Sequence, residues 1–272
     1  MTTTVYVPLD GSGLAEAALL PGAALAGRTG AELVLLAAPW TTEDDHVVEK
    51  YLDFQTAVSS VPARPWFLRD REPADAITLA CESDDALLCM ATHGRTGLRE
   101  AVLGSVAEAV VRRSVAPIVL IGPRFDPGWR LAESPTVLAG YDGSTQARDL
   151  AFVAGRLSAA LGGRLRLEQV LRPSDVVQTP RFPAGEVEAL EGLVAELRER
   201  GVSAQSGISD GFDPADVLVK ESGGADCNLL ALASHGRSGL ERVVLGSVTM
   251  RAVRRAPCPV LVTGPAVLVR PG

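Results

Sequence analysis

Short aliphatic runs alternate with longer amphipathic segments along this chain. In the first half, the runs predict strands at residues 5–9, 33–38, 65–69 and 86–91, and the segments between them predict helices after Ser12, at 47–58, at 73–82 and from Ser105 onward. Ser12 is suited to cap the first helix, and Pro21 is expected to kink it. Strands that alternate with helices require a parallel sheet covered on both faces.

The same pattern occurs twice. The segment VYVPLDGSGLAEAAL at 5–19 returns as VLAGYDGSTQARDLA at 137–151, which aligns Asp10 with Asp142. The segment HGRTGLREAVLGSV at 93–106 returns as HGRSGLERVVLGSV at 235–248, with 10 of 14 positions identical. Each copy closes on a Pro-led aliphatic run, APIVLIG or CPVLVTG. This period is much longer than that of a solenoid, so the duplication is one of whole domains.

The duplication predicts the domain organisation. We expect two tandem, Rossmann-like, doubly wound α/β domains at 1–124 and 135–267. The segment between them, 125–134, is expected to be a linker because it is rich in Gly and Pro.

Composition narrows the class of protein. Of the 272 residues, 47% are apolar and 4% aromatic, which excludes a disordered chain and favours a core of Val, Leu and Ala. A net charge of −7 argues against a nucleic-acid partner. No apolar run approaches the ~18–20 residues of a membrane helix, and no basic segment opens a secretory signal, so we expect a cytoplasmic protein without a membrane partner. The four cysteines form no C-x-x-C pair and are expected to be free thiols.

Candidate binding residues gather at one edge of each predicted sheet. Asp10 and Asp142 end the first strands, and a glycine-punctuated loop follows each fourth strand. Ligands of doubly wound sheets bind at the carboxyl ends of the strands, where the strand order reverses. Gly104-Ser105 and Gly246-Ser247 open a helix whose N-terminus suits a phosphate, with Ser105 as cap or donor. An Asp at the end of the first strand suits ribose hydroxyls.

Structural roles would explain each of these features separately. Asp-Gly-Ser is a common turn, and Gly-Ser is a common helix start. His93 and His235 have no partner nucleophile or ligand cluster in the sequence, so we expect no catalytic and no metal-binding role for them. Arg95 and Arg237 suit either phosphate or solvent. It is the meeting of these features at one crevice that favours a nucleotide site.

These residues resemble the universal stress protein family over nearly the whole chain. Members that bind nucleotides carry G-x-x-G-x9-G-[S/T] after the fourth strand. Here the motif begins with Ala91 or Ala233 and continues through Gly94, Gly104 and Ser105, or Gly236, Gly246 and Ser247. Alanine at the first position costs little if its φ is ordinary, and costs affinity if glycine's freedom is needed there.

The resemblance implies five-stranded parallel sheets of order 3-2-1-4-5 and an adenine nucleotide (ATP, ADP or AMP, alone or with Mg) as ligand. The residues that would bind it are Asp10, Ala38, Gly94, Arg95, Gly104, Ser105 and Val106 in the first domain, and Asp142, Val170, Gly236, Arg237, Gly246, Ser247 and Val248 in the second. The resemblance also implies pairing through the fifth strands, as an intramolecular pseudo-dimer of the two domains or as a homodimer.

Three functions remain open from the sequence. The first is a regulatory stress-response protein that binds nucleotide with at most weak ATP hydrolysis, because the chain has no Walker A lysine and no paired base and nucleophile near the loop. The second is a nucleotide α-hydrolase, suggested by SGGAD at 222–226, although that loop precedes a strand and fits a helix end better. The third is a scaffold that binds protein partners and no nucleotide.

Overall fold

The computed structural model describes residues 2–38, 45–69, 71–83, 85–93, 103–171, 184–224, 227–234 and 245–264. The chain divides into two compact units. Unit 1 contains the described residues up to Pro123 together with Thr263 and Gly264, and unit 2 contains those of Arg124–Val262. No helix in the described ranges combines the length and the apolar character needed to cross a bilayer.

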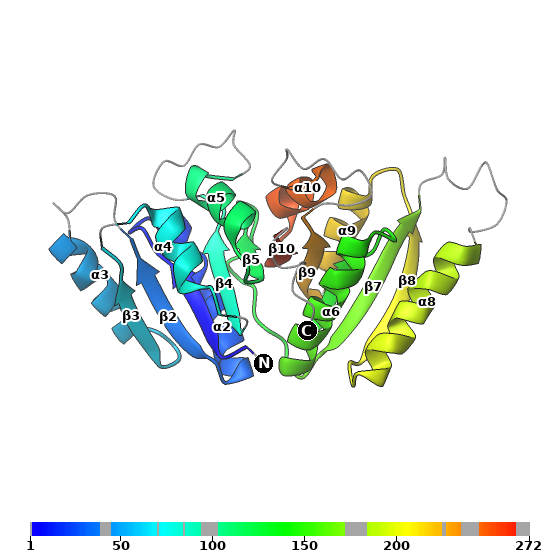
Figure 1. Ribbon diagram of the computed structural model, residues 1–272, viewed down its shortest axis with the longest axis horizontal. Helices are drawn as coiled ribbons and strands as arrows, with labels where there is room; N and C mark the ends of the chain where they lie inside the picture. The colour runs from blue at the N-terminus through cyan, green and yellow to red at the C-terminus, as the bar shows by residue number, and fades with distance from the viewer. Residues whose placement is uncertain are drawn as a thin grey trace. The chain divides into compact units, whose positions relative to one another are not determined.

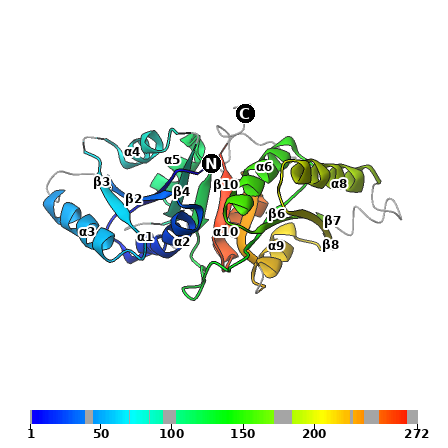
Figure 2. The ribbon, with the colours of Figure 1, turned by 90° about the horizontal axis from the view of Figure 1, so that it is seen from below.

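Unit 1 alternates strands with helices. Its elements are β1 (Thr4–Pro8), α1 (Gly13–Glu16), α2 (Leu19–Thr29), β2 (Glu32–Ala37), α3 (Asp45–Ala57), β3 (Ala63–Phe67), α4 (Pro73–Ala80), β4 (Ala86–Ala91), α5 (Ser105–Arg113) and β5 (Ile118–Ile121). The strand order is β3-β2-β1-β4-β5, and neighbouring strands pair in parallel. The helices α1, α2 and α3 lie on one face of the sheet, and α4 and α5 lie on the other (Figures 1 and 2).

Unit 2 repeats this arrangement. Its elements are β6 (Thr136–Gly140), α6 (Thr145–Ala160), β7 (Arg164–Leu171), α8 (Ala184–Glu199), β8 (Ala204–Asp210), α9 (Pro214–Ser222), β9 (Cys227–Ala233), α10 (Ser247–Arg255) and β10 (Val260–Thr263). The strand order is β10-β9-β6-β7-β8, again with parallel pairings. Two doubly wound sheets of order 3-2-1-4-5 therefore confirm the predicted fold class.

The core consists of aliphatic side chains from strands buried on both faces. All but the first residue of β2 are buried, and all four residues of β5 are buried. This explains the low aromatic content, because two helix layers cover each sheet and the strands need no alternating polar face.

One local prediction is wrong. A single kinked helix was expected after Ser12, but the structure has two helices, α1 and α2, interrupted at Ala17–Ala18. Pro21 is the third residue of α2, where its missing N–H would have no helical partner in any case. The proline therefore sits in the first turn of a new helix and bends nothing.

The segment predicted as a linker lies within unit 2 and packs against its other residues. The Asp126 amide donates to the carbonyl of Pro257 (2.9 Å), and the buried Trp129 donates from Nε1 to the carbonyl of Asn228 (2.9 Å). The boundaries predicted at 124, 135 and 267 stay predictions, as does the pairing of the domains through their fifth strands.

Candidate nucleotide site

A cavity of about 250 Å³ lies in unit 1 at the carboxyl ends of β1 and β4. Its lining comes from seven parts of the chain: Pro8, Leu9, Asp10, Ala15, Leu36, Ala37, Ala38, Val48, Pro73, Ile77, Met90, Ala91, Thr92, His93, Gly104, Ser105, Val106 and Ala107. This is the position where strand order reverses in the β3-β2-β1-β4-β5 sheet.

Most of the lining is aliphatic. Leu36 and Ala37 come from β2, Val48 from α3, and Ile77 from α4. Leu36, Ala37 and Ile77 are buried, while Val48 is half-buried. A surface of this kind accommodates a flat, weakly polar ring and gains free energy by keeping it from water.

Asp10 supplies a carboxylate to the lining. Its Oδ1 accepts hydrogen bonds from the amide of Ser12 (3.0 Å) and from the Ser12 hydroxyl (2.6 Å). Gly11 between them has a φ of 81°, a left-handed conformation that favours glycine. The Asp-Gly-Ser sequence is therefore a true turn, and the turn holds the carboxylate beside the cavity.

The glycine motif ends in a helix start without a side-chain cap. Gly104 is the N-cap of α5, and no side-chain cap hydrogen bond is made there. Ser105 is thus the first helical residue, and its predicted role as a cap is wrong. By contrast, Ser12 caps α1 and Glu72 caps α4. The first-turn N–H groups of α5 point outward with the positive end of the helix dipole, which suits an anion.

The backbone conformation at position 104 does not require glycine. Its φ of −67° is accessible to any residue, and an added Cβ would meet only ordinary contacts, the closest being the Thr92 carbonyl oxygen at 3.4 Å. Ala91 is the last residue of β4 and pairs with Ile121, so it has extended backbone that alanine adopts without strain. The replacement of the first motif glycine by Ala91 therefore causes no backbone strain.

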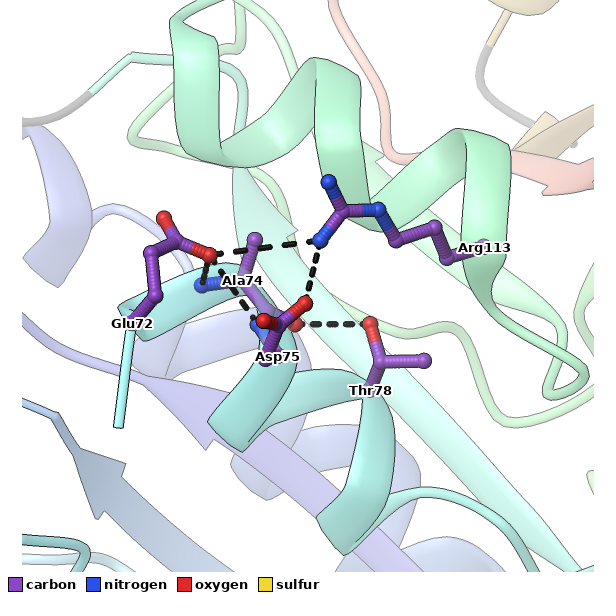
Figure 3. A network of polar contacts seen from close by, with 5 residues as sticks. All are labelled: Glu72, Ala74, Asp75, Thr78 and Arg113. Carbon is purple, nitrogen blue, oxygen red and sulfur yellow. Dashed lines mark hydrogen bonds and ion pairs between the residues drawn. The ribbon is translucent and has the colours of Figure 1, made fainter. Parts of the chain in front are cut away.

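Polar contacts hold the helices around the cavity. Glu72 caps α4 by accepting from the amides of Ala74 (3.1 Å) and Asp75 (3.3 Å). Arg113, at the end of α5, pairs with Asp75 and reaches Glu72 at 4.0 Å (Figure 3). These exposed pairs join α4 to α5, the two helices that line one side of the cavity.

On the other face, α3 is joined to α1. The Tyr51 hydroxyl donates to Glu16 (2.9 Å), and the Gln55 amide reaches the same oxygen (3.2 Å). Burial and the Glu16 carboxylate raise the pKa of Tyr51, so the phenol stays a donor at neutral pH. This contact fixes the helix that brings Val48 to the lining.

Unit 2 has the same Asp-Gly-Ser turn and the same Gly-Ser helix start as unit 1. The Asp142 Oδ1 accepts from the Ser144 amide (3.0 Å), and Gly143 has a φ of 80°. Gly246 is the N-cap of α10, again without a side-chain cap hydrogen bond, and Ser247 is its first residue. Ser105 and Ser247 are both exposed at their helix starts.

The lining positions differ between the two units. Leu36 pairs with Pro8 in unit 1, and Glu168 pairs with Gly140 at the same register position in unit 2. By this register Gln169 replaces Ala37. Counting from the start of the last helix, Thr249 replaces Ala107, and its hydroxyl donates to the Ala233 carbonyl (2.7 Å).

Glu168 is fully buried in a polar cluster of unit 2. Its carboxylate lies 2.6 Å from Arg166, and Arg166 also bonds Glu221 of α9 (2.8 Å). Ser209 Oγ lies 2.6 Å from Glu168 and 2.8 Å from Glu221. Gly207 provides the space, because a Cβ there would lie 2.0 Å from the Glu168 oxygen. A buried carboxylate of this kind is tolerated only with its cation in place.

The structure brings some predicted residues together and leaves others undescribed. Asp10, Ala38, Gly104, Ser105 and Val106 line one cavity. In unit 2, Val248 follows Ser247 in α10, and Val170 is the penultimate residue of β7 rather than lying at its end. Gly94, Arg95, Gly236 and Arg237 lie outside the described residues. The prediction missed the aliphatic positions Leu36, Val48, Ile77 and Met90, which no motif marks.

Two further predictions concern the role of His93 and the candidate hydrolase loop that begins at Ser222. His93 lines the cavity, and its Nδ1 lies 2.9 Å from the Thr92 hydroxyl. Ser222 is the last residue of α9, as expected for a helix end rather than a loop after a first strand. Within the described residues, no group of three or more His, Cys, Asp or Glu side chains is placed to hold a metal ion.

The profile of the universal stress protein family matches residues 1–122 and again residues 134–264. The chain belongs to the universal stress protein family. The tandem match agrees with the sequence duplication and with the two units of the structure.

Individual relatives support this membership. A universal stress protein from Mycobacterium tuberculosis is 31% identical over 186 residues, which cover 65% of this chain and 61% of that protein. The match therefore spans about three fifths of the length of that relative. A universal stress protein from Thermus aquaticus is 30% identical over 131 residues, covering 46% of this chain and 96% of the relative.

A solved structure supports the fold over the whole chain. The crystal structure of a universal stress protein from Archaeoglobus fulgidus has a TM-score of 0.68 and covers 97% of each chain. The identity is 18%, so this similarity concerns the fold alone.

Proposed function

We propose that this universal stress protein binds one adenine mononucleotide in the unit 1 cavity and acts through occupancy of that site. The observation that carries the proposal is a single cavity that joins an aliphatic surface, a carboxylate and an uncapped helix N-terminus. Its volume of about 250 Å³ is just below the range of about 300–1,000 Å³ for ligand pockets, which suits a nucleoside with its phosphates directed outward.

The three chemical parts of a nucleotide fit three parts of the lining. The base would lie against Leu36, Val48 and Ile77, where burial of a flat ring is favourable. The ribose would lie beside Asp10, whose carboxylate accepts hydrogen bonds from hydroxyls. The phosphates would meet the Ser105 hydroxyl and the first N–H groups of α5, which are charge-assisted donors to an anion.

The proposed phosphate position explains why residue 104 is glycine. The protein itself leaves room for a side chain at this position, as the contacts of an added Cβ show. A glycine there instead allows a phosphate to approach the helix start closely.

The lining favours binding over catalysis. Its titratable side chains among the described residues are Asp10 and His93. The Asp10 carboxylate is held by Ser12, and the His93 ring by Thr92. Rapid phosphoryl transfer needs in addition a positioned nucleophile and cations on the transferred group. A magnesium ion would arrive with the phosphates, near Asp10 and Ser105.

Equilibrium dialysis with labelled ATP and AMP tests the proposal in the full chain. Gly104→Glu should weaken binding about 100-fold, because the new carboxylate occupies and repels the phosphate position. Gly246→Glu is the matched control in unit 2 and should leave the affinity unchanged. Circular dichroism of both variants would verify that each retains its helices and strands.

Other outcomes would contradict the proposal. Equal loss in both variants would place a nucleotide in each unit. Absence of binding by the unaltered chain at millimolar nucleotide would favour the protein scaffold instead.

A further inference from the structure

Two thiols of unit 2 lie next to each other at the beginning of neighbouring strands. Cys227 is the first residue of β9, and Cys258 lies two residues before β10. The strands are adjacent in the sheet, and the Leu230 amide donates to the Pro259 carbonyl (3.1 Å). The Cys227 thiol donates to the carbonyl of Leu229 (3.4 Å), and both Cys227 and Cys258 are free cysteines.

A short segment holds these two strand starts together. We call residues 126–130 the clasp. The amide of Asp126 donates to Pro257, the residue before Cys258 (2.9 Å). Trp129 donates from Nε1 to the carbonyl of Asn228, the residue after Cys227 (2.9 Å). The clasp therefore bonds to both chain segments that carry the thiols, which limits their separation.

The surroundings of the two sulfurs differ from those of the other cysteines. Cys227 is half-buried, so solvent reaches it, whereas Cys258 is buried. The neighbouring Cys227 thiol lowers the pKa of Cys258, and Ser222 and nearby backbone groups act in the same direction. The Cys258 thiol and burial raise the pKa of Cys227. In unit 1, burial raises the pKa of Cys81 to about 12 and also raises that of Cys89. Nucleophilic thiolate is therefore favoured at Cys258 and disfavoured at Cys227 and at both cysteines of unit 1.

We propose that Cys227 and Cys258 are a redox modification site that closes to an intramolecular disulfide when the protein meets a peroxide. The bond from the Leu230 amide to the Pro259 carbonyl places Cys258 opposite Asn228, so Cys227 is its diagonal neighbour. With strands ~4.8 Å apart and residues ~3.3 Å apart along a strand, the diagonal Cα separation is about 6 Å, within the range that a disulfide spans. Unit 1 carries Ala116 at the place of Cys258 in the repeated A/C-P motif, so the site belongs to unit 2 alone.

The chemistry needs only the peroxide as oxidant. The first sulfur attacks the peroxide, the O–O bond breaks, and the sulfur becomes a sulfenic acid while one water leaves. The second thiol then attacks that sulfur, the S–S bond forms, and the hydroxyl leaves as a second water. Both sulfurs are oxidised, the peroxide is reduced, and the two thiol protons end on water. A dithiol reductant reverses the reaction by exchange.

Mass spectrometry of the full chain tests this site. The reduced protein is treated with stoichiometric hydrogen peroxide, alkylated without reductant and digested with trypsin. Free thiols should fall from four to two per chain, with the peptides beginning at Glu221 and Ala256 joined by a disulfide. Cys81 and Cys89 should remain alkylated as internal controls, and dithiothreitol should restore all four thiols.

Cys227→Ser and Cys258→Ser are the matched variants. Each should abolish the linked peptides and leave a sulfenic acid on the remaining cysteine that dimedone traps. The proposal is overturned if the unaltered chain keeps four free thiols, if it links through Cys81 or Cys89, or if both sulfurs oxidise without joining. These readouts are taken on the unaltered chain first, so they do not depend on the folding of a variant.

Discussion

The two units have the same turn and the same helix start at the carboxyl ends of their strands, but they differ in the residues beside them. Both have an Asp-Gly-Ser turn after the first strand and an uncapped Gly-Ser helix start after the fourth. Where unit 1 has Leu36 and Ala37, unit 2 has Glu168 and Gln169. The comparison shows that after duplication the motif can persist while the surface that would receive a base changes character.

The two units also share an ion pair outside the glycine motif. Arg113 joins α5 to Asp75 of α4 in unit 1 (Figure 3). Arg255 joins α10 to Asp216 of α9 in unit 2. Such pairs are exposed and contribute little to stability individually. Their repetition indicates that the last two helices of each unit pack against each other in the same way, so the differences in lining do not arise from a different fold.

The largest expected effect is on the stability of unit 2, when Arg166 is replaced. Arg166→Ala should lower the unfolding free energy of unit 2 by about 3 kcal/mol, because Glu168 would remain buried without its cation. Urea denaturation followed by circular dichroism measures this change. The control Arg64→Ala removes an exposed pair with Glu32 in unit 1 and should cost about 0.5 kcal/mol. Similar costs in both variants would contradict a structural role for the buried carboxylate.

The next effect concerns the phosphate end of the site. Ser105→Ala should weaken ATP binding about 10-fold, because a hydrogen bond to a charged group contributes about 1.5 kcal/mol. Ser247→Ala removes the equivalent hydroxyl from unit 2 and should leave ATP affinity unchanged. Isothermal titration calorimetry measures both. A loss at Ser247 equal to that at Ser105 would show that the units bind alike.

A smaller effect is expected at the base end. Val48→Ala removes two carbons from the lining and should weaken binding of AMP and ATP equally, by about 5-fold. Val47 is its neighbour on α3 and is 66% exposed, so Val47→Ala is a matched control that should leave both affinities unchanged. If Val48→Ala weakens ATP but not AMP, the aliphatic surface does not hold the base.

Much of the fold was predictable from the sequence, because buried parallel strands are short aliphatic runs. The strand predicted at 86–91 is observed as Ala86–Ala91, and the helix predicted from Ser105 begins there. The Asp-Gly-Ser turns were also predictable, since glycine with a positive φ leaves a local signal at Gly11 and Gly143.

The lining was not predictable in the same way. Val48 and Ile77 come from helices far apart in the sequence, and each looks like an ordinary core residue. Arg166, which is half-buried, and Glu168, which is fully buried, alternate along β7 as polar residues of an exposed strand face would. The burial of the carboxylate depends on the space left by Gly207 on the neighbouring strand. Such features depend on packing between elements, which local patterns do not encode.

A crystal structure of the full chain grown with AMP would test the central claim most directly. The account predicts density for one nucleotide in unit 1, with its base against Val48 and Ile77, its ribose at Asp10 and its phosphate at the start of α5. Density for a nucleotide between Asp142 and Ser247 of unit 2, or none at Asp10 and Ser105, would contradict it.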